Sequence, residues 1–124
     1  MNFQRFESIT GHEATSARIG TMVSAQAACD CGSVCVVFVT TAKSQSEALK
    51  QLHVAIYRHH CQTVFERQLG KCSRCGQRLQ LEPHHKVRRS KGRDDRLTNL
   101  EFLCHRDHER ETNPVRRADT KESA

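Results

Sequence analysis

Cysteine and histidine residues are concentrated in one short block of the sequence, and this block constrains the fold more than any other feature. It holds three cysteines, four histidines and an asparagine, namely Cys72, Cys75, His84, His85, Asn99, Cys104, His105 and His108. Hydrophobic residues make up only 36% of the 124 residues and there is no Trp, so a hydrophobic core is small and benefits from a metal cross-link. The block therefore predicts a lobe organised around metal ions.

The net charge of +6 is distributed unevenly along the chain. Residues 1–70 contain six Lys/Arg and five Asp/Glu, whereas residues 71–124 contain fourteen and nine. The half that carries the cysteine–histidine block is therefore the basic half. A positive surface beside a metal site suits a polyanionic partner such as DNA, although charge alone fits an ordinary solvated surface equally well.

The seven cysteines are an odd number, so they cannot all pair with one another within one chain. The first residues lack the apolar run of a signal peptide, and no stretch has the length and apolar character of a membrane span. We therefore expect a cytoplasmic protein with no membrane partner, in which Cys-x-x-Cys indicates metal binding. A redox role is disfavoured, because no thioredoxin-like βαβ pattern surrounds the pair.

The pattern along the chain predicts an α+β protein with four parts. Residues 1–20 are polar and mixed, and we expect them to be poorly ordered. Residues 21–70 are expected to form an accessory lobe, a β-hairpin followed by a helix. Residues 71–113 form the cysteine–histidine lobe, and residues 114–124 form a charged tail.

Within the accessory lobe, extended segments are expected at 22–28 and 33–41, around a tight turn at 29–32. Ser44 begins a helix-capping box, and apolar residues continue from there at helical spacing until Gly70. The turn contains Cys29 and Cys31, with Cys35 nearby; together with His59, His60 or Cys61 they would form a second metal site. We favour the simpler interpretation of small, partly buried cysteines around a hairpin.

Within the cysteine–histidine lobe, the sequence predicts a metal knuckle at 72–76 and a short strand at 78–82 that leads to the histidine pair. A return strand or turn is expected at 97–103. A helix then begins near residue 104 and continues to residue 111, and Asn113-Pro114 ends it.

The three thiols of this lobe have a spacing that suits tetrahedral zinc. Cys72 and Cys75 are two residues apart with Cys104 following much later, and such a site needs a fourth ligand. Asp107 and His108 lie three and four residues after Cys104, so both share its helical face. The pattern alone leaves the choice between them open.

The adjacent histidines His84 and His85 end the predicted strand. Neighbouring residues on a strand point to opposite faces, so one imidazole can bind a metal ion while the other faces a water molecule. A neutral imidazole is a suitable general base for activating that water. An isolated histidine pair is usually a surface feature, but the other members of the block favour the functional interpretation.

This block resembles the HNH endonuclease family, which has the ββα-metal fold, over roughly residues 71–112. The matching residues are Cys72, Cys75, Gly76, His84, His85, Gly92, Asn99, Leu100, Leu103, Cys104 and His108. The resemblance implies that His84 and His108 bind the catalytic metal ion and that His85 is the general base. It also implies that Asn99 fixes the loop that carries the base by hydrogen bonds.

One position departs from the family pattern, because Asp107 stands where zinc-stapled members have the fourth cysteine. Three accounts are open. Asp107 binds zinc through oxygen, or the zinc site is lost, or His108 completes the zinc site and the catalytic metal loses a ligand. We favour a zinc site of Cys72, Cys75, Cys104 and Asp107, which keeps both sites intact with weaker zinc binding than a four-thiolate site.

The leading hypothesis is therefore an HNH-type endonuclease that hydrolyses phosphodiester bonds in DNA. It would use Mg²⁺, Mn²⁺, Ni²⁺ or Zn²⁺ at the catalytic site, a structural Zn²⁺, and no small-molecule cofactor. The basic residues after the histidine pair are candidates for phosphate contacts, namely Arg88, Arg89, Lys91, Arg93 and Arg96. The alternative is a non-catalytic zinc-binding module for nucleic acid. The oligomeric state, including a dimer, is left open.

Overall fold

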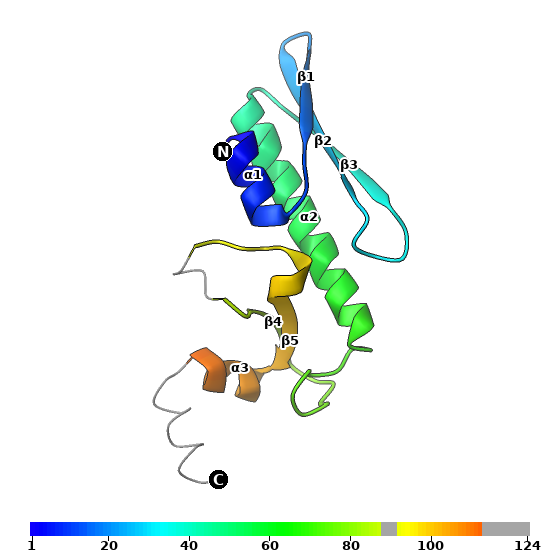
Figure 1. Ribbon diagram of the computed structural model, residues 1–124, viewed down its shortest axis with the longest axis vertical. Coiled ribbons are helices and arrows are strands. Elements are labelled where there is room, and N and C mark those ends of the chain that lie inside the picture. Colours follow the sequence, from blue (N-terminus) through cyan, green and yellow to red (C-terminus); the bar gives the residue numbers. More distant parts are fainter. Residues whose placement is uncertain (88–91, 113–124) are drawn as a thin grey trace.

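The computed structural model describes residues 1–87 and 92–112 (Figure 1). Its elements are, in chain order, α1 (Phe3–Thr10), β1 (Thr15–Ile19), β2 (Met22–Cys29), β3 (Val36–Ala42), α2 (Gln45–Arg67), β4 (Leu81–His85), the 3-10 helix η2 (Leu97–Asn99), β5 (Leu100–Cys104) and α3 (His105–Thr112). The strands form a three-stranded sheet of order β1-β2-β3 and a separate β4-β5 pair, and all pairings are antiparallel. This mixture confirms the α+β class.

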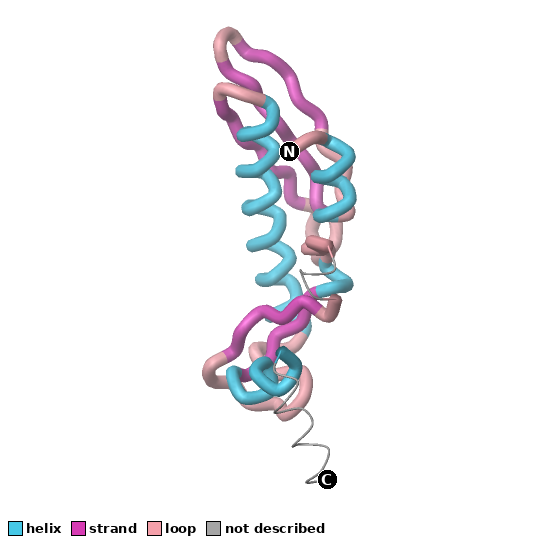
Figure 2. The backbone as a smooth tube through the Cα atoms, turned by 90° about the vertical axis from the view of Figure 1, so that its left-hand side faces the viewer, coloured by secondary structure: helices cyan, strands magenta, loops and turns pink. Residues whose placement is uncertain are grey.

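Helix α2 is the longest element and contacts both sheets. Its first part packs against α1 and the three-stranded sheet, and its C-terminal end reaches the β4-β5 pair (Figures 1 and 2). The Ser44 hydroxyl accepts a hydrogen bond from the Glu47 backbone N–H at 3.2 Å, as expected for the helix cap. Its side chains Leu49, Leu52 and Ile56 are fully buried and form the centre of the main core.

The structure differs from the expectation of a poorly ordered start, because residues 1–20 form α1 and β1. The Asn2 side chain caps α1 by accepting from the Arg5 N–H at 2.8 Å, and Gly11 ends it in a left-handed conformation with φ 75°. The helix buries Phe6 and Ile9, and Phe6 joins the core of α2. Strand β1 is a mostly exposed edge strand, which explains why its sequence shows no apolar alternation.

The β2–β3 hairpin is present with a longer connection than expected. Its register pairs Cys29 with Val36, so the connection runs over 30–35 instead of forming a tight turn at 29–32. Strand β3 is buried on one face only: Phe38 packs against the main core, whereas Val37 remains 61% exposed.

The strand that carries the histidine pair begins later than expected. Gln80 has a left-handed backbone with φ 55° and Leu79 is 73% exposed, so residues 78–80 are not part of the strand. Strand β4 therefore starts at Leu81 and includes both histidines, and His84 lies opposite Glu101 of β5.

The chain turns at 72–76, between α2 and β4, where the metal knuckle was expected. The Gly76 N–H donates to the Cys72 carbonyl at 3.0 Å, and the Cys72 N–H donates to the Gln77 carbonyl at 2.8 Å. Gly76 has φ 77°, a conformation that a residue with a side chain adopts only at a cost. This turn brings the two knuckle cysteines back toward β5.

Two sets of contacts attach the β4-β5 region to the rest of the chain. Gln68, at the end of α2, donates to the Phe102 carbonyl at 3.0 Å and accepts from the Phe102 N–H at 2.8 Å. The segment before η2 crosses to α1, where the Asp95 N–H donates to the Ile9 carbonyl at 2.8 Å. The accessory elements and the cysteine–histidine region therefore share buried contacts.

All seven cysteines lie in the described part of the chain, and none of them forms a disulfide. Among these residues no helix combines the length and the apolar character that crossing a membrane requires. The expected Asn113-Pro114 helix stop and the charged tail at 114–124 lie outside the described residues.

Candidate active site and metal centre

The three thiols of the knuckle and β5 converge with Asp107 of α3. The ligand atoms of Cys72, Cys75, Cys104 and Asp107 all lie within 4.8 Å of one another. Cys75 Sγ is 3.7 Å from Cys104 Sγ, and Asp107 Oδ2 is 3.3 Å from the sulfurs of both Cys72 and Cys104. Ligands of a tetrahedral zinc would be about 3.8 Å apart for two thiolates and about 3.5 Å apart for a thiolate and an oxygen. These four side chains therefore have the dimensions of a zinc site.

His108 is directed away from this cluster. Its ring lies against that of His84, with ring centroids 5.2 Å apart, and its Nδ1 is 2.7 Å from a carboxylate oxygen of Glu82. Because a carboxylate accepts, Nδ1 carries the hydrogen, and in the neutral imidazole Nε2 has a lone pair that can bind a metal ion. Burial and the neighbouring His108 lower the pKa of His84, which favours the neutral form that binds metals.

His85 points to the other side of β4 and contacts Asp95. Its Nε2 is 2.6 Å from Asp95 Oδ1, and the Asp95 side chain is completely buried. Burial alone would raise the pKa of Asp95, but hydrogen bonds from His53, Arg93 and His85 outweigh it and hold this pKa well below its usual value. An ionised Asp95 can only accept, so Nε2 of His85 carries the hydrogen, and in the neutral imidazole Nδ1 has the lone pair.

Asp95 is also bound to the accessory elements. Its second carboxylate oxygen, Oδ2, is 2.6 Å from Nε2 of His53 and 2.8 Å from Nε of Arg93. Its backbone carbonyl accepts from Nδ1 of His60 at 2.8 Å. The residue that orients His85 is thus held by helix α2.

Asn99 joins the two ends of the segment between the histidine pair and η2. Its side-chain oxygen accepts from the Val87 N–H at 2.8 Å, and its amide donates to the Asp94 carbonyl at 2.7 Å. Its own carbonyl accepts from the Lys86 N–H at 2.8 Å. Asn99 therefore holds Lys86 and Val87, which follow the histidine pair, close to Asp94.

The candidate phosphate-binding residues fall into two groups. Arg88, Arg89 and Lys91 lie outside the described residues. Arg93 and Arg96 are both paired with acidic residues: Arg93 with buried Asp95 and Arg96 with Asp94, through two bonds of 2.9 and 2.8 Å. Arg96 remains half-exposed in this pair.

Three residues with clear contacts to the site were not assigned from the sequence. Asp95 lies in a basic loop, where it looked like a charge that only offset its neighbours. His53 lies on the same face of α2 as Leu49, Leu52 and Ile56, and a buried histidine on an apolar stripe was the signal that could have identified it. Glu82 is two residues before the histidine pair and therefore projects on the same face of β4 as His84.

Comparison with known proteins finds one family that matches part of the chain. The model of the HNH endonuclease family matches residues 72–114, which contain the cysteine–carboxylate cluster, both histidine sites and Asn99. No similar curated protein and no similar solved structure was found. The match covers the β4-β5-α3 region, which has the strand–strand–helix order of a ββα-metal core. Residues 72–114 of this chain therefore match the HNH endonuclease family, and their structure is consistent with a ββα-metal core.

Proposed function

We propose that this protein is a metal-dependent endonuclease that hydrolyses phosphodiester bonds in DNA, with His85 as general base. The observation that carries the proposal is the pairing of two differently oriented histidines on one strand. His84 faces His108, and His85 faces a buried carboxylate. Metal-dependent hydrolysis of a phosphodiester uses one group that binds the metal ion and another that accepts a proton, and these two histidines can fill the two roles.

His85 takes a proton from water through Nδ1. Oδ1 of the buried Asp95 lies 2.6 Å from Nε2 of His85 and accepts its hydrogen. The imidazole therefore presents the lone pair of Nδ1 in a fixed orientation. As His85 becomes positively charged, Asp95 stabilises the imidazolium. The water that loses its proton attacks phosphorus.

His84 and His108 would hold the catalytic metal ion. The donor set fits: His84 is buried and kept neutral, and the Glu82 carboxylate fixes the His108 ring with Nε2 unprotonated. When bound, a divalent ion supplies a positive charge that polarises the phosphate and stabilises the leaving oxygen. Imidazole ligands alone do not decide which of Mg²⁺, Mn²⁺, Ni²⁺ and Zn²⁺ is the catalytic ion.

Cys72, Cys75, Cys104 and Asp107 would hold a structural zinc ion. The oxygen of Asp107 lies 3.3 Å from two of the sulfurs, in the fourth ligand position. This arrangement supports the account in which both sites are intact, and it leaves His108 available to the catalytic site. The alternative of a non-catalytic zinc module depends on His108 as a zinc ligand, whereas the contacts of His108 with His84 and Glu82 support a place in the catalytic site.

A plasmid cleavage assay tests the proposal. Supercoiled DNA is incubated with the protein and Mg²⁺, Mn²⁺, Ni²⁺ or Zn²⁺ in turn, and nicked and linear products are quantified over time. The His85→Ala variant should cleave about 10²- to 10⁴-fold more slowly, which is the usual contribution of a general base. Its DNA affinity should change little, because His85 is 11% exposed in its side chain and contacts the protein interior.

The matched control is His105→Ala. His105 is 54% exposed in its side chain and begins the same helix that carries His108. It contacts the Glu82 oxygen that His108 does not use, so its removal deletes an imidazole near the site and leaves the Glu82–His108 bond, the proposed ligands and the base in place. This variant should cleave at close to the parental rate. A His85→Ala variant that cleaves as fast as the parent would refute the assignment of the base. Absence of cleavage with every metal, with DNA binding retained, would favour the binding module.

A further inference from the structure

A second group of potential metal ligands lies in the accessory part of the chain, outside the HNH domain. The ligand atoms of His12, Cys29, Cys31 and His60 all lie within 4.8 Å of one another. Cys29 and His60 are fully buried, whereas His12 and Cys31 are half-buried. The side chains come from three places: the α1–β1 connection, the end of β2 with the turn that follows it, and the middle of α2.

The separations between these ligand atoms are close to those of a tetrahedral zinc site and slightly shorter. His12 Nε2 is 3.0 Å from His60 Nε2 and 3.4 Å from Cys31 Sγ. Around zinc, two imidazole nitrogens would be about 3.4 Å apart, and a nitrogen and a thiolate about 3.6 Å. Two thiolates and two imidazoles form one of the common structural zinc ligand sets.

The tautomer of His60 also points to a metal ion. Its Nδ1 lies 2.8 Å from the backbone carbonyl of Asp95, and a carbonyl only accepts, so Nδ1 carries the hydrogen. Nε2 therefore presents a lone pair to His12 and the two cysteines. A metal-binding histidine is usually oriented by such a bond from its other nitrogen to a carbonyl or carboxylate.

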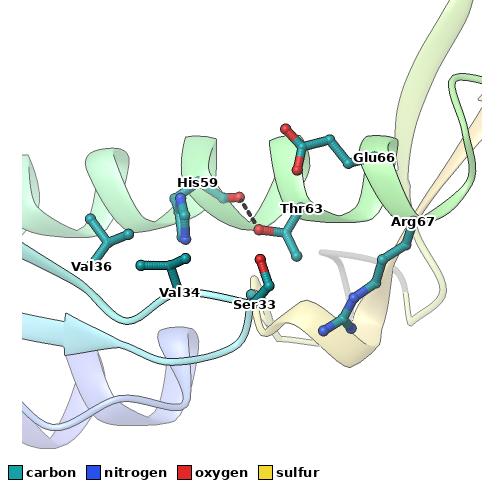
Figure 3. A pocket seen from close by; sticks show the side chains of 8 residues that line it. Ser33, Val34, Val36, His59, Thr63, Glu66 and Arg67 are labelled. Carbon is teal, nitrogen blue, oxygen red and sulfur yellow. Dashed lines mark hydrogen bonds between the residues drawn. The ribbon is translucent and has the colours of Figure 1, made fainter.

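The turn that carries Cys31 is held against α2 beside His60. The Arg67 guanidinium donates to the Cys31 carbonyl. Figure 3 shows the continuation of this turn, with Ser33 and Val34 facing His59 and Thr63 of α2 and with Arg67 extending along the same side. The backbone around Cys31 is thus fixed by contacts that do not use its thiol, which leaves Sγ directed toward the histidines.

We propose that His12, Cys29, Cys31 and His60 bind a structural zinc ion that joins α1, the β2–β3 turn and α2. The site is separate from the zinc site of the HNH domain and does not depend on nuclease activity. The ion would stabilise this part of the chain, because the turn at 30–35 buries few apolar side chains. Through His60 it would also fix the carbonyl of Asp95, whose carboxylate contacts His85.

Zinc content of the purified full-length chain tests the site. Weakly bound metal is first removed on a chelating resin. The number of zinc ions per chain is then measured by elemental mass spectrometry. The Cys31→Ser variant should contain one zinc ion fewer than the parent, and Cys104→Ser should independently lose one. Co²⁺-loaded parent protein should show tetrahedral cobalt bands with sulfur charge transfer, and those bands should weaken but persist in each variant.

The control variant is Cys35→Ser, which removes an exposed cysteine four positions after Cys31 and should keep the parental zinc content. If Cys31→Ser and His12→Gln both retain the parental zinc content while Cys104→Ser removes all tightly bound zinc, the second site does not exist.

A measurement on the unmodified chain guards against variants that fail to fold. Alkylation of each cysteine is mapped by peptide mass spectrometry with and without a strong chelator. Cys31 should be protected until the chelator is added, whereas Cys35 should react in both conditions. If Cys31 reacts at the same rate with and without the chelator, no metal ion is bound there.

Discussion

Replacing Asp95 by Asn tests whether the carboxylate of Asp95 sets the tautomer of His85. The carboxylate receives hydrogen bonds on both oxygens: Oδ1 from His85, and Oδ2 from His53 and Arg93. Asn has the same shape but only one accepting oxygen. That oxygen should remain on the side with two donors, so the amide N–H₂ group would face His85.

This exchange forces a change in His85. Its Nε2–H would meet another donor, and the imidazole avoids the conflict by moving its hydrogen to Nδ1. The lone pair that accepts the proton of water is then lost. We therefore expect the cleavage rate to fall by about 10²- to 10³-fold, within the range of a general base. The loss of one charge-assisted hydrogen bond should reduce the free energy of unfolding by about 1.5–3 kcal/mol.

The assay combines single-turnover plasmid cleavage with urea unfolding, and the control is Asp94→Asn. Asp94 pairs with Arg96 at the surface, so its variant should cleave within about threefold of the parent and lose at most about 1 kcal/mol. In a His85→Ala background, Asp95→Asn should lower the residual rate only slightly, since both substitutions act on one group. Parental activity of Asp95→Asn, or fully multiplicative losses in the double variant, would refute the role of Asp95.

Three further outcomes are expected. Asp107→Cys should raise the affinity of the HNH-domain zinc, measured by competition with a chelator, because a thiolate replaces a harder oxygen ligand; a lower affinity would remove Asp107 from the ligand position. Glu82→Ala should raise the Mn²⁺ concentration for half-maximal cleavage by about 10- to 100-fold, since Glu82 orients His108, and an unchanged concentration would contradict this. Leu52→Ala should lower the free energy of unfolding by about 2–5 kcal/mol in urea titrations, because Leu52 is fully buried in the main core; a loss below 1 kcal/mol would indicate a loosely packed core.

The sequence predicted the HNH region well because its signals are local. The Cys72-x-x-Cys75 turn needs only a few residues and a glycine with positive φ. The placement of His84 and His85 on opposite faces follows from strand geometry alone. Expectations failed where composition misled: the start of the chain is polar and mixed, yet Phe3, Phe6 and Ile9 recur every three residues along α1, and Phe6 and Ile9 are buried.

Among the three accounts of Asp107, the tertiary structure supports the one in which Asp107 is a zinc ligand. Asp107 and His108 lie on the same helical face, so spacing could not separate them. The positions of Glu82 and His84 on β4 draw His108 to one side, and the thiols of Cys72 and Cys104 lie at Asp107 on the other. The contacts with β4 thus distinguish Asp107 from His108, whereas their positions along the helix do not.

The sequence by itself determined the cysteine turn at 72–76, the placement of the histidine pair on a strand and the position of Asn99, because each depends on a few residues that are neighbours in the chain. Only the tertiary structure brought Asp95 to His85 and His53, and His12 to His60. The partners in these contacts are up to 48 residues apart. No periodicity in a sequence connects residues at such distances, because their proximity depends on how α1, α2 and the segment before η2 pack together.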